Sequence, residues 1–96
     1  MKIEKKMSGT ELTVAVEGRL DTMTAPELEK ALKEHYGSVT GLTLDFAKLE
    51  YISSAGLRVV LSAHKAMSGK LVVKNVTEVV MEVFEVTGFS DILNIA

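Results

Sequence analysis

The sequence of 96 residues contains no cysteine, so it can form no disulfide, no zinc–thiolate site and no thiol nucleophile. Its apolar runs are a few residues long, far short of the roughly 20 that span a bilayer, and no signal-peptide pattern opens the chain. The formal net charge of −2 comes without a basic stripe that would follow nucleic acid phosphates. We therefore expect a cytoplasmic protein that neither binds nucleic acid nor inserts into a membrane.

The length suits a single domain over residues 1–96, which would bury roughly 60–65% of the surface of its unfolded chain. In the first half, Ile3–Met7 favours a short strand, and alternating apolar residues in Leu12–Val16 predict a second one that ends at Gly18. Thr24-Ala25-Pro26-Glu27 is typical of a capping box and predicts a helix that ends at Gly37. The apolar stripe of this helix consists of Leu28, Ala31, Leu32 and Tyr36.

The second half continues the alternation of strands and helices. Leu42–Phe46 predicts a strand that ends in a turn at Lys48–Glu50, and a helix runs from Ser53 or Ser54 to about Met67. Leu71–Val73 follows as a buried strand. Asn75-Val76-Thr77-Glu78 predicts a last helix that Gly88 ends. Its apolar stripe consists of Val76, Val79, Val80, Val83 and Phe84.

The resulting order β-β-α-β-α-β-α predicts an α/β fold with a small mixed sheet. Strands joined by helices favour parallel pairing, whereas the first two strands can pair as a hairpin.

Residues with the chemistry of catalysis are scarce. His64 lies ten positions after Ser54 along one predicted helix, roughly 15 Å away, too far to act as the base of that serine. His35 belongs to another helix, and no two carboxylates are placed so that one would raise the pKa of the other. The sequence also lacks a glycine-rich phosphate loop and a Gly-x-Ser-x-Gly turn. We therefore expect no enzyme, no metal site and no cofactor.

Ser53 and Ser54 stand where a strand pattern gives way to a helix. Serine is a preferred N-cap, so a purely structural cap is one interpretation. Only one serine is needed for capping, however, and the other hydroxyl is then left for a partner or for modification. Arg58 follows one turn after Ser54 and its side chain can reach back toward an anion at the helix start.

The segment Tyr51-Ile52-Ser53-Ser54-Ala55-Gly56-Leu57-Arg58, together with Gly18-Arg19-Leu20-Asp21 and Thr87-Gly88-Phe89, resembles a STAS domain of the bacterial anti-sigma factor antagonist family. The resemblance covers nearly the whole chain in order and spacing. It implies a mixed sheet of four to five strands with the helices packed mainly on one face.

The resemblance also implies a function. Members of this family bind an anti-sigma factor that is also a serine kinase, which frees a sigma factor. The kinase phosphorylates a serine that matches Ser54, and a serine phosphatase reverses the reaction. Because Ser53 stands where the family often has aspartate, Ser53 is the alternative phosphorylation site. The expected partner-binding residues are Asp21, Thr22, Ser53, Ser54, Gly56, Leu57 and Arg58.

Two other functions stay open. The chain can instead be a passive STAS subunit of a transporter or a signalling scaffold, without phosphorylation. A nucleotide bound at the same helix start is the other alternative, although neither a phosphate loop nor its lysine is present.

Overall fold

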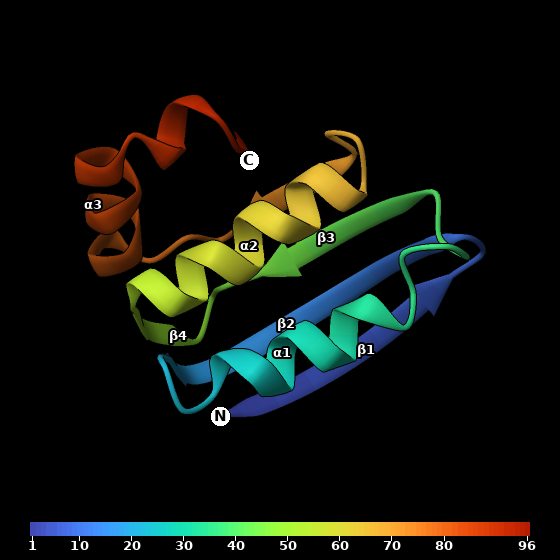
Figure 1. Ribbon diagram of the computed structural model, residues 1–96, viewed down its shortest axis with the longest axis horizontal. Helices are drawn as coiled ribbons and strands as arrows, with labels where there is room; N and C mark the ends of the chain where they lie inside the picture. Colours follow the sequence, from blue (N-terminus) through green and yellow to red (C-terminus); the bar gives the residue numbers. More distant parts are fainter.

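The computed structural model describes residues 1–96 as a six-stranded sheet with three α-helices and one 3-10 turn (Figure 1). The strands are β1 (Lys2–Ser8), β2 (Glu11–Leu20), β3 (Gly41–Asp45), β4 (Leu49–Ile52), β5 (Leu71–Lys74) and β6 (Asn94–Ile95). The helices are α1 (Ala25–Lys33), α2 (Ser54–Ala66) and α3 (Glu78–Thr87), and the 3-10 turn is η1 (Phe89–Asp91). None of these helices combines the length and the apolar character that crossing a membrane requires.

The strands lie in the order β1-β2-β3-β5-β6, with β4 beside the second half of β2. β1 and β2 form an antiparallel hairpin, and every other pair is parallel. The predicted mixed sheet is confirmed, but it has six strands rather than four to five. The additional strands β4 and β6 have only four and two residues, too few for a clear alternating pattern in the sequence.

β2 changes its parallel partner halfway along its length. Residues Glu11–Ala15 pair with β3, whereas Gly18–Leu20 pair with β4, and the register shifts between Gly18 and Arg19. Gly18 has a φ of +100°, a conformation that side chains disfavour. The prediction that Gly18 ends the strand is therefore wrong, because this glycine lets the strand bend and continue. The predicted turn at Lys48–Glu50 is wrong as well, since Leu49 begins β4.

α1 and α2 cover one face of the sheet, and α3 packs beside β4 at one end of the molecule (Figure 1). The covered face is apolar because the strands alternate as predicted, with Leu12, Val14 and Val16 of β2 all buried. The core contains 23 apolar residues, and no polar or charged side chain is buried. This core holds the ends of β2 and β4 in fixed positions.

The two predicted capping boxes are wrong in detail. Thr24 precedes α1 and Thr77 precedes α3, yet neither side chain accepts a hydrogen bond from its helix. The Thr77 hydroxyl donates instead to the carbonyl oxygen of Leu49 (3.0 Å) and so ties α3 to β4. α3 begins at Glu78 with Thr77 as its N-cap, so Asn75, the cap that the second box predicted, lies outside the helix with a φ of +56°.

The helix ends and faces agree with the sequence only in part. α1 ends at Lys33 rather than at Gly37, and a turn of irregular chain follows. The residues of the two predicted stripes that are fully covered are Leu28, Leu32, Val80 and Phe84. Val79 is 54% exposed, and Val76 lies before the helix.

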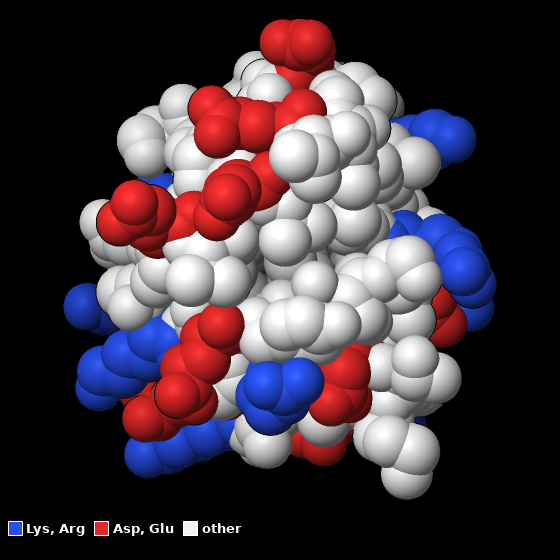
Figure 2. All heavy atoms as spheres, turned by 90° about the vertical axis from the view of Figure 1, so that its left-hand side faces the viewer, with Lys and Arg blue, Asp and Glu red and all other residues white.

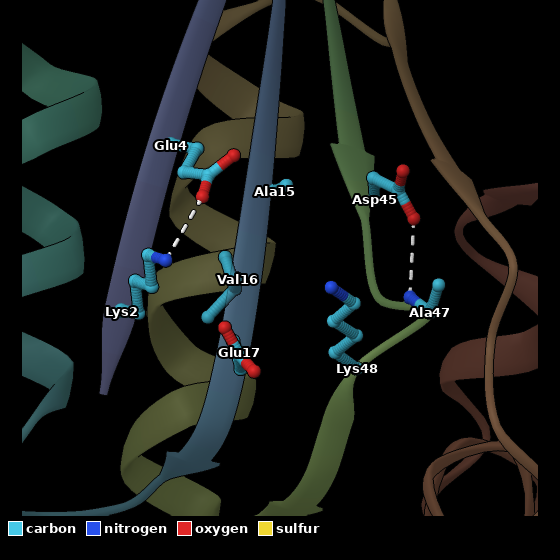
Figure 3. A pocket seen from close by; sticks show the side chains of 8 residues that line it. All are labelled: Lys2, Glu4, Ala15, Val16, Glu17, Asp45, Ala47 and Lys48. Atoms are coloured by element: carbon cyan, nitrogen blue, oxygen red, sulfur yellow. Dashed lines mark hydrogen bonds and ion pairs between the residues drawn. The ribbon is translucent and has the colours of Figure 1, made fainter.

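The opposite face of the sheet is open, and Figure 3 views it with α2 behind the strands. It holds a hollow of ≈ 190 Å³ lined by Lys2, Glu4, Ala15, Val16, Glu17, Asp45, Ala47 and Lys48. Three of the charged groups here have partners: Lys2 pairs with Glu4 (3.3 Å), and Asp45 accepts a hydrogen bond from the backbone of Ala47 (3.1 Å). The hollow contains none of the predicted site residues and is smaller than the roughly 300 Å³ at which ligand pockets begin.

Candidate functional site

The carboxyl ends of β2 and β4 meet at one edge of the sheet because these two strands are parallel. Leu20 pairs with Ile52, and the backbone N–H of Ser53 donates to the carbonyl oxygen of Leu20 (2.9 Å). The loop that begins at Asp21 therefore lies beside the serine turn, although the two segments are far apart in the sequence. This placement brings together the residues that the sequence singled out at both segments.

The two serines differ in what their hydroxyl groups do. Ser53 is the N-cap of α2, and its oxygen accepts a hydrogen bond from the backbone N–H of Gly56 (3.4 Å). Ser54 is the first residue of the helix, is exposed, and its hydroxyl bonds to no group of the protein. Since Ser53 does the capping, the Ser54 hydroxyl is accessible to an enzyme in solution.

The start of α2 itself favours an anion at Ser54. The first turn of α2 contains no acidic residue that would offset the positive end of the helix dipole. Arg58, one turn further along, is exposed and forms no ion pair within the chain. A negative group on Ser54 would therefore meet the unpaired N–H groups of the helix start and a free guanidinium on the same helix.

Asp21 organises the loop next to the serine turn. Its Oδ1 accepts hydrogen bonds from the backbone N–H groups of Met23 (3.0 Å) and Thr24 (3.2 Å). Partial loss of hydration raises the pKa of the Asp21 carboxyl, but the bonds from Thr24 and Met23 and the nearby Arg19 outweigh it and hold that pKa below its ordinary value. Asp21 is thus a carboxylate at neutral pH and serves first as a scaffold for its own loop.

Arg19 and Tyr51 form a pair that the sequence interpretation missed. They face each other across β2 and β4, and the Arg19 guanidinium lies 4.2 Å from the centre of the Tyr51 ring. The Arg19 Nε is also 3.9 Å from Oδ2 of Asp21, and its side chain is 62% exposed. Finding this pair needed the register between β2 and β4, and β4 itself was not predicted.

Gly56 allows α2 to approach the end of β2. A Cβ atom at this position would lie 2.8 Å from Cγ of Leu20 and 2.9 Å from the Leu20 carbonyl oxygen. Gly56 is buried, and Leu57 is only 6% exposed. Neither residue presents a surface to a partner, so both position the serine turn, whereas Ser54, Thr22 and Arg58 are exposed.

A shallow groove between α1 and α2 connects the two segments of the site. Its volume is ≈ 210 Å³, and its lining consists of Thr22, Ala25, Pro26, Glu29, Ala55, Arg58, Val59 and Ser62. Two predicted partner-binding residues, Thr22 and Arg58, therefore border the same groove.

Figure 2 views the end of the molecule where α3 and the start of α2 lie. Acidic side chains gather in its upper part, over α3, whereas basic and acidic side chains are mixed in its lower part. α3 carries the exposed residues Glu78, Glu82 and Glu85 and no basic residue. A protein that docks on this end meets an acidic helix beside the serine turn.

Comparison with known proteins gives matches over nearly the whole chain. A family model described as "Mlab, STAS domain" matches residues 3–94. The anti-sigma-B factor antagonist of Listeria monocytogenes is 34% identical over 101 residues, which cover 99% of this chain and 88% of that protein.

Solved structures of the same fold are also similar. SpoIIAA, an anti-sigma factor antagonist, in its unphosphorylated form superposes with a TM-score of 0.85 at 19% identity, covering 99% of this chain and 88% of that one. The Bacillus cell fate determinant SpoIIAA in its phosphorylated form gives a TM-score of 0.77 at 19% identity, over 99% and 91% of the two chains. At this level of identity the two structures show the fold. The family model and the Listeria relative show that the chain belongs to the STAS domain family, in which its relatives are named anti-sigma factor antagonists.

Proposed function

We propose that this chain binds an anti-sigma factor with serine kinase activity, thereby frees a sigma factor, and is switched off when that kinase phosphorylates Ser54. A serine phosphatase restores the active form, and we place the whole cycle in the cytoplasm. The chain itself acts as a binding protein without catalytic activity. The observation that carries the proposal is the division of roles between Ser53, which caps α2, and the exposed, unbonded hydroxyl of Ser54.

The modification is a simple transfer. The Ser54 Oγ attacks the γ-phosphorus of ATP held by the kinase, the bond to the bridging oxygen breaks, and ADP leaves. A base of the kinase takes the hydroxyl proton. The chain contributes an accessible nucleophile at the start of a helix, held by the cap at Ser53 and by the close approach at Gly56.

Phosphorylation at this position should leave the fold intact. A phosphate adds roughly −1.5 to −2 charges at neutral pH. At a helix N-terminus this charge is favourable by about 0.3–1 kcal/mol, and the unpaired Arg58 adds to the attraction.

The same charge acts differently on docking. Against a partner surface that is acidic, or that holds the phosphates of a nucleotide, a like-charge contact costs several kcal/mol. At about 1.4 kcal/mol per tenfold change in affinity, binding weakens a hundredfold or more. The switch therefore works by blocking the interface. The existence of SpoIIAA, a protein of this fold, in a phosphorylated form supports the proposal.

The test is phosphate incorporation by the anti-sigma factor kinase of the same organism with Mg²⁺ and ATP, followed by intact mass and peptide mapping. We expect one phosphate per chain, located on Ser54 and lost in Ser54→Ala. Ser53→Ala is the matched control and should still accept it. A chain that binds the partner but never takes up phosphate would contradict the switch and support a passive STAS subunit, whereas phosphate on Ser53 would contradict our choice of residue.

A further inference from the structure

Met23 is the most exposed large apolar side chain of the molecule, at 87%. It stands in the loop between β2 and α1, two residues after Asp21. Exposed methionines are common on protein surfaces, so exposure alone carries no function. Two further properties of this position, the stiffness of its loop and its place next to Ser54, set it apart.

The backbone around Met23 is held on both sides. The Met23 N–H donates to Oδ1 of Asp21 (3.0 Å), and the Asp21 N–H donates to Oγ1 of Thr24 (2.9 Å). The Thr24 hydroxyl donates in turn to the carbonyl oxygen of Arg19 (2.8 Å), and the N–H of Ala25 donates to the carbonyl oxygen of Asp21 (2.7 Å). A flexible side chain thus projects from a loop whose backbone is already ordered.

The loop lies directly beside the proposed switch. Ser53 is bonded to Leu20, the residue before Asp21, and Thr22 borders the groove that Arg58 also lines. A protein that docks close enough to reach Ser54 therefore also covers this loop. Because Met23 is 87% exposed in the free chain, its burial by a partner contributes more binding free energy than burial of a side chain that is already covered.

We propose that Met23 is the apolar anchor of this docking surface and that it enters an apolar pocket on the anti-sigma factor, next to the point where Ser54 is covered. The inference rests on the proposed function and adds to it the chemistry of the contact. An ordered loop lowers the entropy lost on binding, and a methionine side chain adapts to the shape of a pocket. The partner must therefore carry a hydrophobic recess beside the surface that accepts the serine turn.

The test compares two exposed methionines of the same chain. Met23→Ser is paired with Met7→Ser. Met7 is also exposed, at 48%, but it lies on β1 and not in the loop between β2 and α1. Calorimetric titration with the purified anti-sigma factor kinase should show a Kd at least tenfold weaker for Met23→Ser, in the range of interface hot spots. Met7→Ser should stay within twofold of wild type, and Met23→Leu within about threefold.

Kinase kinetics give a second readout. Because Met23 touches the partner and not the reacting atoms, Met23→Ser should raise the KM for phosphorylation of Ser54 and leave kcat within about twofold. Thermal unfolding of the same variant should match wild type, since Met23 is already 87% exposed in the free chain. An unchanged Kd and KM for Met23→Ser, or an equal loss for Met7→Ser, overturns the inference.

The outcomes separate the two claims. If the wild-type chain binds and Ser54→Asp loses binding while Met23→Ser does not, the proposed function stands and the anchor is wrong. If the wild-type chain shows no binding to the kinase at all, both claims fail.

Discussion

The two adjacent serines illustrate how one position is freed for regulation. Ser53 satisfies a backbone N–H at the start of α2, and Ser54 has no structural bond to lose. Had a single serine occupied the turn, the same hydroxyl would have had to serve both as the cap and as the site of modification. The sequence alone indicated that one of the two hydroxyl groups is not needed for capping, and the geometry assigns the cap to Ser53.

Gly56 provides a residue-scale prediction. In Gly56→Ala, the new methyl group would press on Leu20 and Ile52, whose nearest atoms lie 2.8 and 2.9 Å from the ideal Cβ position. Overpacking of this kind costs about 1–3 kcal/mol. The gain in helix propensity, about 1 kcal/mol, offsets part of it. We expect a net loss of roughly 1 kcal/mol in the free energy of unfolding, measured by urea denaturation.

Gly37→Ala is the control for this effect. Gly37 lies after α1, and an added Cβ would meet no atom within 4 Å. Its substitution should change the free energy of unfolding by less than about 0.5 kcal/mol. A Gly56→Ala protein as stable as Gly37→Ala would mean that the close approach of α2 to β2 is not needed.

At the scale of elements, the site exists because β2 has two parallel partners along its length. Its first half lies beside β3 and its second half beside β4, so the Asp21 loop emerges next to the start of α2. Gly18, with its φ of +100°, sits where the register shifts. The functional surface is thus a consequence of sheet topology and joins two segments that the sequence separates.

The cap of α2 gives a prediction at this scale. Ser53→Ala removes the only side-chain bond at the helix start and should lower the free energy of unfolding by about 0.5–1 kcal/mol, the lower part of the range for N-caps, since the bond is long at 3.4 Å. Ser54→Ala removes no bond and should change it by less than about 0.3 kcal/mol. Chemical denaturation of the two variants side by side is the measurement. Equal losses, or a larger loss for Ser54→Ala, would contradict the assignment of the cap.

Long periodic elements could be predicted from the sequence, and short ones could not. The strand containing Leu12–Val16 and the helix after Ser53 follow from their apolar spacing, and both are confirmed. β4 was not predicted because its four residues are too few to show alternation of apolar and polar side chains, and Lys48–Glu50 has the polarity of a turn. Asn75 was expected to cap the last helix, but the helix begins after Thr77, whose hydroxyl donates to the carbonyl oxygen of Leu49, a partner that only the tertiary structure supplies.

The same limit applied to the candidate site. The serine pair was found from its position at a helix start, whereas Asp21 and the choice of Ser54 came from a family resemblance; the structure places the two segments side by side. The Arg19–Tyr51 stack needed the strand register, and the exposure of Met23 needed the loop conformation. Burial of Gly56 and Leu57, which the motif alone presented as partner contacts, follows from the packing of α2 on the sheet.

At the scale of the whole molecule, the residues that stabilise the fold are separate from those proposed for recognition. The apolar core of 23 residues lies between the sheet and the helices, whereas Ser54 and Met23 lie outside it. A charge added at the surface start of a helix changes the free energy of unfolding by at most about 1 kcal/mol. The same charge inside an interface changes the binding free energy by several kcal/mol. Regulation without unfolding follows from this difference.

The most direct test measures affinity and stability on the same four samples. These are the wild-type chain, the chain phosphorylated on Ser54, and the Ser54→Asp and Ser54→Ala variants. Each sample is titrated with the anti-sigma factor kinase, and its Tm is measured by thermal unfolding. The phosphorylated chain should bind at least a hundredfold more weakly than wild type, Ser54→Asp should be weakened in the same direction, and Ser54→Ala should bind like wild type. All four should unfold cooperatively, with Tm values within about 8 °C of one another. A phosphorylated chain that binds as tightly as wild type, or one that loses binding only because it no longer folds, would contradict the account.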